Sequence, residues 1–94
     1  MKIITLRNTE TVMYAAEELK KYLFMMDLDI DAEICTEGNG EIVLGLLSDL
    51  KLDDSDVKDA MIDDVVDVNI DSLKGYIAGS NERSILFGVY KYSL

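Results

Sequence analysis

GYIAGSNERSILFGVYKYSL, from Gly75 to Leu94, carries the clearest structural signal in this chain of 94 residues. Its first part, up to Gly79, is made of small and apolar residues and is typical of a short strand in a crowded sheet. Ser80 or Asn81 can then cap a helix, because a short side-chain oxygen accepts hydrogen bonds from first-turn N–H groups that lack a helical partner. Apolar residues at helical spacing follow, at Leu86, Val89, Tyr90 and Tyr92. A strand therefore passes into a helix with almost no linker.

The strongest helical pattern in the sequence lies near the amino terminus. Lys2 to Leu6 is a β-branched run that predicts a strand. A helix is then expected from Asn8 or Thr9 to Met26, because its apolar residues repeat with the period of a helix. They form one stripe: Val12, Ala15, Ala16, Leu19, Leu23 and Met26.

DLDIDAEIC, from Asp27 to Cys35, permits two interpretations. The alternating acids resemble the opening of an EF-hand calcium loop, which also needs glycine at its sixth position and glutamate at its twelfth. This chain has Ala32 and Gly38 at those positions, so the calcium pattern fails. Alternation instead predicts a strand of period two, with four apolar residues facing a core: Leu28, Ile30, Ala32 and Ile34.

Three further strands are expected. Glu41 to Leu47 is apolar on both faces, which is typical of a central strand covered on both sides. Val65 to Ile70 alternates, and Asp71 to Lys74 can turn it back onto Tyr76 to Gly79 as a β-hairpin.

Ser48 to Asp64 is rich in aspartate and is interpreted as a solvated face, with one short helix from about Asp54 to Met61. The predicted fold is a two-layer α/β sandwich, a single domain over residues 1–94. It has a mixed sheet of about five strands, with two long helices on one face. The elements follow in the order strand, helix, strand, strand, short helix, strand, strand, helix.

Composition restricts the chemistry. There is no histidine, which excludes Ser/His and Cys/His nucleophile pairs and histidine metal ligands. Cys35 is the only cysteine and is expected to be a buried structural thiol. The net charge of −10 argues against nucleic acid and anionic membranes as partners. No catalytic, cofactor-binding or metal-binding residue is predicted, and Met1 to Leu6 is too short for the core of a signal peptide.

Three motifs together resemble one family. They are YAAEELKKYL from Tyr14 to Leu23, EIVLG from Glu41 to Gly45, and the final stretch from Gly75 to Leu94. They resemble the small non-catalytic α/β domain that precedes the catalytic barrel in alpha-glucuronidases, beta-hexosaminidases and related glycoside hydrolases. That domain typically ends in a strand–turn–helix of the form GGS-x-R-G-LLYGVY. This chain matches it at Gly79, Ser80, Arg83 and Gly88, and departs from it at Ala78 and Ser84, where the family usually has glycine.

The resemblance implies an accessory domain that supports or orients a catalytic barrel in cis and has no catalytic residue of its own. It also implies a structural role for Arg83, tying the helix start to the sheet or to the barrel. The residue pattern alone instead predicts an exposed first-turn arginine. Two other hypotheses stay open: a free-standing protein-interaction or ligand-binding module that uses the open sheet face for a partner or another copy of itself, and a small enzyme that relies on Asp and Tyr.

Two packing expectations complete the sequence analysis. Glycine inside a helix costs about 0.5–1 kcal/mol relative to alanine, so Gly88 is expected to mark a close helix–helix crossing against Ala15 and Ala16. Two helices can cover only one side of a sheet. The other side is expected to lie under the segment from Ser48 to Asp64 or in a contact between chains.

Overall fold

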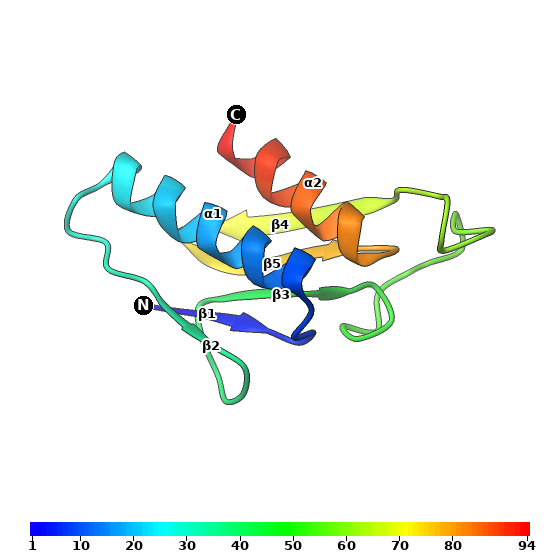
Figure 1. Cartoon of the computed structure of the whole chain (residues 1–94), viewed down its shortest axis with the longest axis horizontal. Coiled ribbons are helices and arrows are strands. Elements are labelled where there is room, and N and C mark those ends of the chain that lie inside the picture. The colour runs from blue at the N-terminus through cyan, green and yellow to red at the C-terminus, as the bar shows by residue number, and fades with distance from the viewer.

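The computed structural model describes residues 1–94 (Figure 1). Its elements are β1 (Lys2–Thr5), α1 (Glu10–Met26), β2 (Glu33–Cys35), β3 (Ile42–Leu46), β4 (Val66–Asp71), β5 (Lys74–Gly79) and α2 (Glu82–Ser93). Thr9 is the N-cap of α1 and Asn81 is the N-cap of α2, so the predicted starts of both long helices are confirmed.

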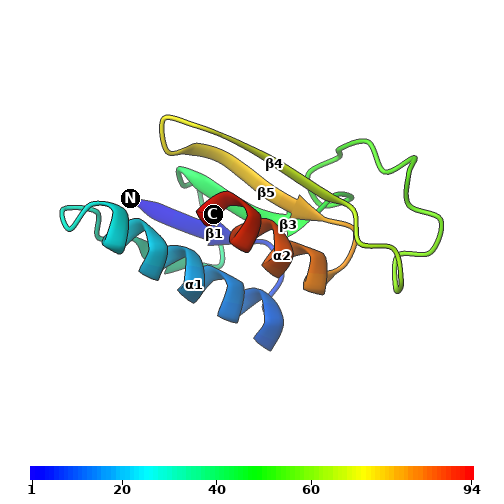
Figure 2. The same cartoon turned by 90° about the horizontal axis from the view of Figure 1, so that it is seen from above.

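The five strands form one mixed sheet in the order β2-β1-β3-β5-β4. β1 runs parallel to β2 and β3, β3 runs parallel to β5, and only β4 is antiparallel to its neighbour, β5. Both helices lie side by side on one side of the sheet (Figure 2). The predicted two-layer α/β sandwich is therefore confirmed, with β3 in the central position.

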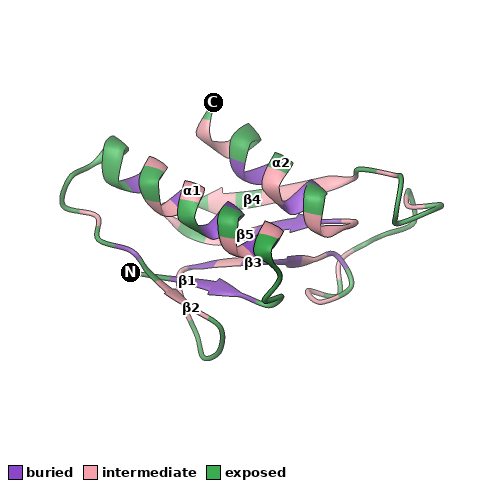
Figure 3. Ribbon diagram, viewed as in Figure 1, coloured by how far each residue is buried: buried purple, intermediate pink, exposed green.

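The hydrophobic core lies between the helices and the sheet, and in Figure 3 the buried stripes of both helices face the strands. Twelve buried residues form it: Ile3, Val12, Ala15, Ala16, Leu19, Leu23, Ala32, Ile42, Leu44, Ile77, Ile85 and Val89. The helices also touch through Tyr22 and Tyr92, whose ring centroids are 5.8 Å apart in an edge-to-face arrangement. Two residues of the predicted apolar stripes, Met26 and Tyr90, are exposed instead.

β4 and β5 form the predicted hairpin, with Asp71 paired to Lys74 across a two-residue turn. Ser72 and Leu73 fill the turn with φ values of 52° and 63°. Two positive φ values are the property of a type I′ turn, whose twist matches that of the flanking strands. The turn therefore adopts the favoured hairpin geometry without the glycine that such turns usually contain.

The short helix expected from about Asp54 to Met61 is absent, and the segment consists of turns. Aspartate side chains take the backbone N–H groups that a helix would need. The Asp63 carboxylate accepts from the N–H groups of Lys58 and Asp59, both at 2.9 Å, and Asp59 accepts from the N–H of Met61 at 3.0 Å. Such local side-chain hydrogen bonds compete with helical ones, which explains why the prediction was wrong.

The strand expected over Asp27 to Cys35 is shorter than predicted, because β2 contains only its last 3 residues. The Asp27 side chain accepts from the N–H of Asp29 at 2.9 Å, and its carbonyl accepts from the N–H of Ile30 at 2.9 Å. The chain therefore turns here. Leu28, which was expected in the core, is exposed.

Gly88 faces the sheet and not the alanines of α1, which corrects the predicted helix–helix crossing. A Cβ atom at this position would lie 2.5 Å from Cγ2 of Ile77 and 3.0 Å from Cγ1 of Val66. The missing side chain therefore lets α2 approach β5 and β4 closely.

On the side of the sheet away from the helices, called here the open sheet face, the three central strands place Ile4, Leu6, Val43, Gly45, Tyr76 and Ala78. The segment from residue 48 to residue 64 extends beyond one end of the sheet and does not lie over this face (Figures 1 and 2). That part of the expectation was wrong. A contact between chains at this face stays a prediction.

Candidate functional site

The carboxyl ends of the parallel strands β1, β3 and β5 meet at one edge of the sheet, where both helices also begin. In open α/β sheets this edge is the usual place for ligands, and helix N-termini attract anions there. It is also where Gly79, Ser80 and Arg83 of the strand–turn–helix lie. This edge is therefore the candidate site.

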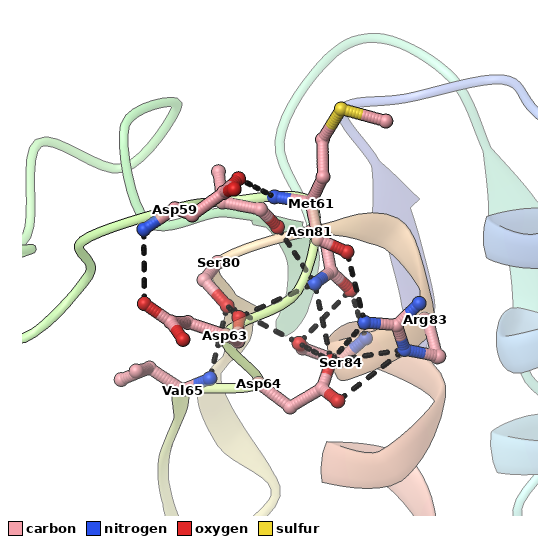
Figure 4. Close-up of polar contacts among 10 residues, drawn as sticks. Asp59, Met61, Asp63, Asp64, Val65, Ser80, Asn81, Arg83 and Ser84 are labelled. Carbon is pink, nitrogen blue, oxygen red and sulfur yellow. Dashed lines mark hydrogen bonds and ion pairs between the residues drawn. The ribbon is translucent and has the colours of Figure 1, made fainter.

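Asp64 is the centre of a polar cluster at the start of α2 (Figure 4). Its Oδ1 atom accepts hydrogen bonds from Nδ2 of Asn81 at 3.1 Å and Nε of Arg83 at 3.0 Å, and it lies 2.8 Å from the Ser84 hydroxyl. The Arg83 guanidinium also donates through Nη2 to the carbonyl of Met61 at 3.1 Å. We call Asp63, Asp64, Ser80, Asn81, Arg83 and Ser84 the Asp64 cluster.

Ser80 and Asn81 join this cluster to the chain that precedes β4. The N–H of Ser80 donates to the carbonyl of Val65 at 2.9 Å, and its hydroxyl accepts from the N–H of Val65 at 2.9 Å and donates to the carbonyl of Asp63. Oδ1 of Asn81 accepts from the N–H of Ser84 at 2.8 Å, while its Nδ2 donates to the carbonyl of Ala60 at 2.8 Å. Asn81 therefore caps α2 and also holds the segment from Ser48 to Asp64, called here the acidic segment.

Gly79 is required at the end of β5 by the close approach of the helix. A Cβ atom there would lie 2.6 Å from Cβ of Ser84 and 2.7 Å from the backbone nitrogen of Ile85. The backbone nitrogen cannot move without shifting the first turn of α2. Ser84 is fully buried and occupies the position where the resembling family usually has glycine. Its hydroxyl finds a partner in Asp64, so the departure from the family pattern is accommodated.

A second ion pair lies on the same edge of the sheet. Arg7, just after β1, donates to Asp49, just after β3, through Nε at 3.0 Å and Nη2 at 2.7 Å. Oδ2 of Asp49 also accepts from the N–H of Leu46 at 3.0 Å. The pair fastens the ends of two adjacent parallel strands.

The carboxylates of this edge are stabilised in their ionised form. Hydrogen bonds from Arg83 and Ser84 lower the pKa of Asp64, and the N–H groups of Asp59 and Lys58 lower the pKa of Asp63. The hydrogen bond from Arg7 likewise lowers the pKa of Asp49. A carboxyl group of lowered pKa has no proton to give near neutral pH, which is the opposite of what a general acid needs.

The hollow beside the cluster offers no further reactive group. It has a volume of about 450 Å³ and is lined by Thr11, Leu46, Ala60, Met61, Ser80, Asn81, Glu82 and Arg83. No buried side-chain nitrogen or oxygen in the protein lacks a hydrogen-bond partner. Asp64 accepts hydrogen bonds from side chains of the N-cap and first turn of α2, so a negative charge of the chain itself already lies at this helix start. The buried polar side chains of this edge are therefore satisfied by the chain itself.

Of the four motif residues, the structure brings Gly79, Ser80 and Arg83 together, while Gly88 lies farther along α2 against the sheet. The sequence analysis missed Asp63, Asp64 and the Arg7–Asp49 pair. No local signal distinguishes Asp49 and Asp64 from the acids around them, because the side chains that bind them lie between 17 and 42 residues away in the sequence. The carboxylate of Asp63 instead accepts from the nearby N–H groups of Lys58 and Asp59.

No protein-family model matches this chain, and no curated protein matches it either. No group of three or more Cys, Asp or Glu side chains is arranged to hold a metal ion. Neither helix has both the length and the apolar character needed to cross a membrane.

Proposed function

We propose that this chain is a non-catalytic accessory domain, similar to those that precede the catalytic barrel of glycoside hydrolases, and that it supports or orients such a barrel in cis. The observation that carries the proposal is the strand–turn–helix from Gly79 to Gly88, in which every motif residue has a structural task. Gly79 and Gly88 permit close packing, Ser80 extends the hairpin, and Arg83 binds Asp64. Because all four motif residues have structural roles, the motif supports a domain that acts as a scaffold.

The electrostatics of the candidate site also support a non-catalytic role. Paired acids in a glycosidase need one carboxyl group with a raised pKa to protonate the leaving group. At this edge the pKa values of Asp49, Asp63 and Asp64 all shift downward. Each of these carboxylates is already held by hydrogen bonds within the chain.

Arg83 is exposed, as the residue pattern predicts, and its structural contact is with the acidic segment. Its side chain is about half exposed, as a first-turn arginine should be, yet it pairs with Asp64 at 3.0 Å. The pair joins the start of α2 to the acidic segment. It leaves part of the guanidinium free to contact a neighbouring domain.

The alternative, a free-standing module that uses the open sheet face, has less support. Ile4 is only 2% exposed and Ala78 is fully buried without any helix above them. Leu6, at 40%, is the one large hydrophobic residue of this face with substantial exposure. A partner would gain little apolar contact there.

The test starts from the reading frame that encodes Leu94. We expect it to continue into a catalytic domain, and we expect the protein produced from it to hydrolyse glycosides. The 94-residue chain alone should leave aryl-glucuronide and aryl-hexosaminide substrates intact. A frame that ends at Leu94 would refute the proposal, as would turnover by this chain that is lost in Asp64→Asn.

A further inference from the structure

The turn between β2 and β3 contains a dipeptide that occurs once in the chain, Asn39 followed by Gly40. The turn projects from the sheet in Figure 1, and residues 36–39 are all exposed. A Cβ atom added at Gly38 would meet no packed neighbour within 4 Å, so the turn is open on its outer side. The side chain of Asn39 is therefore freely accessible to water.

The backbone nitrogen of Gly40 is also free. Its N–H donates to no acceptor of the chain, although the next N–H, that of Glu41, donates to the carbonyl of Lys2 at 3.0 Å. Gly40 has no side chain that could shield this nitrogen from the residue before it. The nitrogen of Gly40 and the side-chain amide of Asn39 are therefore neighbours in the sequence, and no hydrogen bond of this N–H holds them apart.

The other three asparagines lack this combination. Asn81 is held through Nδ2 by hydrogen bonds to the acidic segment and caps α2. Asn69 lies within β4, where pairing with β5 fixes the backbone. Asn8 is exposed, but it precedes Thr9, whose branched side chain crowds the backbone nitrogen. Only Asn39 joins an exposed side chain to an unhindered nitrogen.

We propose that Asn39 is a site of spontaneous deamidation, and that its isoaspartate product loosens the contact between β1 and the start of β3. The nitrogen of Gly40 attacks Cγ of Asn39, and the bond from Cγ to the amide nitrogen breaks. That nitrogen leaves as ammonia and takes the proton of the Gly40 N–H. Water then opens the cyclic imide: cleavage at the backbone carbonyl gives isoaspartate, and cleavage at the side-chain carbonyl gives aspartate. This inference does not rest on the proposed function.

Isoaspartate inserts an additional carbon atom into the main chain just before Gly40, where the chain packs closely against β1. A Cβ atom at Gly40 would lie 2.7 Å from Cγ1 of Ile4 and 2.8 Å from the carbonyl oxygen of Lys2. Glu41 holds the same strand, because its N–H donates to the Lys2 carbonyl at 3.0 Å and its carboxylate accepts from the Lys2 N–H at 2.8 Å. A longer main chain at residue 39 therefore displaces these contacts, whereas aspartate adds a charge without lengthening the chain.

The experiment is to incubate the 94-residue chain in mildly alkaline buffer, which speeds removal of the N–H proton, and to locate deamidation by peptide mass spectrometry. We expect Asn39 to be modified several-fold faster than Asn8, Asn69 and Asn81. A synthetic peptide of residues 36–42 should react at a similar rate, because the turn in the folded chain is open. Asn39→Gln is the control variant and should stay unmodified, since its longer side chain would have to close a larger ring.

Hydrogen exchange tests the consequence for the sheet. The isoaspartate form, separated by chromatography, should exchange several-fold faster at the N–H groups of Lys2 and Glu41 than the unmodified protein. The N–H of Ile77, in the middle of β5, is the internal control and should be unchanged. Asn39→Asp carries the same new charge on an ordinary main chain and should exchange as the unmodified protein does.

Three results would overturn the inference. Strong protection of Asn39 in the folded chain relative to the peptide would show that the turn is closed, and equal rates at all four asparagines would show that the turn does not favour the reaction. Exchange in Asn39→Asp as fast as in the isoaspartate form would assign the loosening to charge and not to the longer main chain. Unchanged exchange in the isoaspartate form would show that β1 and β3 tolerate it.

Discussion

The strand–turn–helix of β5 and α2 and the acidic segment from Ser48 to Asp64 meet in the Asp64 cluster, but they are ordered by different means. The first is held by buried apolar side chains and by two glycines that allow close packing. The second contains no helix or strand and is fastened by hydrogen bonds to residues far away in the sequence. One half of the Asp64 cluster is therefore positioned by apolar packing of helix and strand, and the other half by side-chain hydrogen bonds between distant segments.

Gly79→Val should cause the largest loss of stability in the strand–turn–helix. The new side chain meets the backbone of Ile85, so the first turn of α2 must move. We expect the free energy of unfolding to fall by about 3 kcal/mol, at the upper end for overpacking. Urea denaturation measures it. Lys74→Val, at the exposed start of the same strand, is the control and should change stability little. Equal effects of the two substitutions would contradict the close approach at Gly79.

Gly88→Leu should destabilise the protein by about 1–3 kcal/mol, because the added side chain is forced against Ile77 and Val66. Lys91→Leu introduces the same side chain at an exposed position of α2 and serves as the control. Thermal denaturation compares the two variants. A melting temperature of Gly88→Leu equal to or above that of the control would show that Gly88 does not face the sheet.

Asn81→Ala removes the helix cap and the hydrogen bond to Ala60 together. The loss of a cap costs about 1 kcal/mol. Asn81→Asp keeps the capping oxygen but loses the donor to Ala60, and hydrogen exchange should then increase in the acidic segment while α2 stays protected. If exchange in the segment does not change, Asn81 is not what holds it.

Acid should loosen the acidic segment first. The pKa values of Asp49, Asp63 and Asp64 are lowered by folding, so protonation favours the unfolded state. Their contribution is complete above the unfolded pKa of about 3.9 and is lost as the pH falls through the lower folded values. Asp64→Asn should therefore narrow the difference in melting temperature between pH 7 and pH 3, whereas the exposed Asp54→Asn should not. If the difference in melting temperature between pH 7 and pH 3 is as large in Asp64→Asn as in the unchanged protein, the hydrogen bonds of Asp64 in the cluster do not contribute to stability.

The sequence predicts the elements well where a period or a turn signal is present. The stripe of α1, the cap at Asn81 and the hairpin around Ser72 and Leu73 all follow from local patterns. Local patterns failed where side chains compete with the backbone, as in the turns at Asp27 and Asp59. Local patterns also do not show which element Gly88 contacts. Spacing along a helix shows which residues share a face, but not which helix or strand packs against that face.

The Asp64 cluster could be predicted only in part. The turn residues Ser80 and Asn81 stand out because capping depends on the next few residues. Asp64 does not stand out among the acids around it, since its role depends on Arg83, 19 residues later. The exposure of Tyr90 was hidden for a related reason, because Tyr90 fits the apolar period of α2 and only the packed structure shows that it is exposed.

The place of β4 at the edge of the sheet has a consequence for handling this protein in solution. Its outer side presents backbone groups that another strand could pair with, a recognised route to aggregation. Asp67 and Asp71 lie along this strand, and like charges on approaching copies keep the edges apart. The net charge of the whole chain falls to zero near its isoelectric point of about 4.2, where copies repel one another least. Fibril growth should therefore begin close to that pH and be seeded from β4.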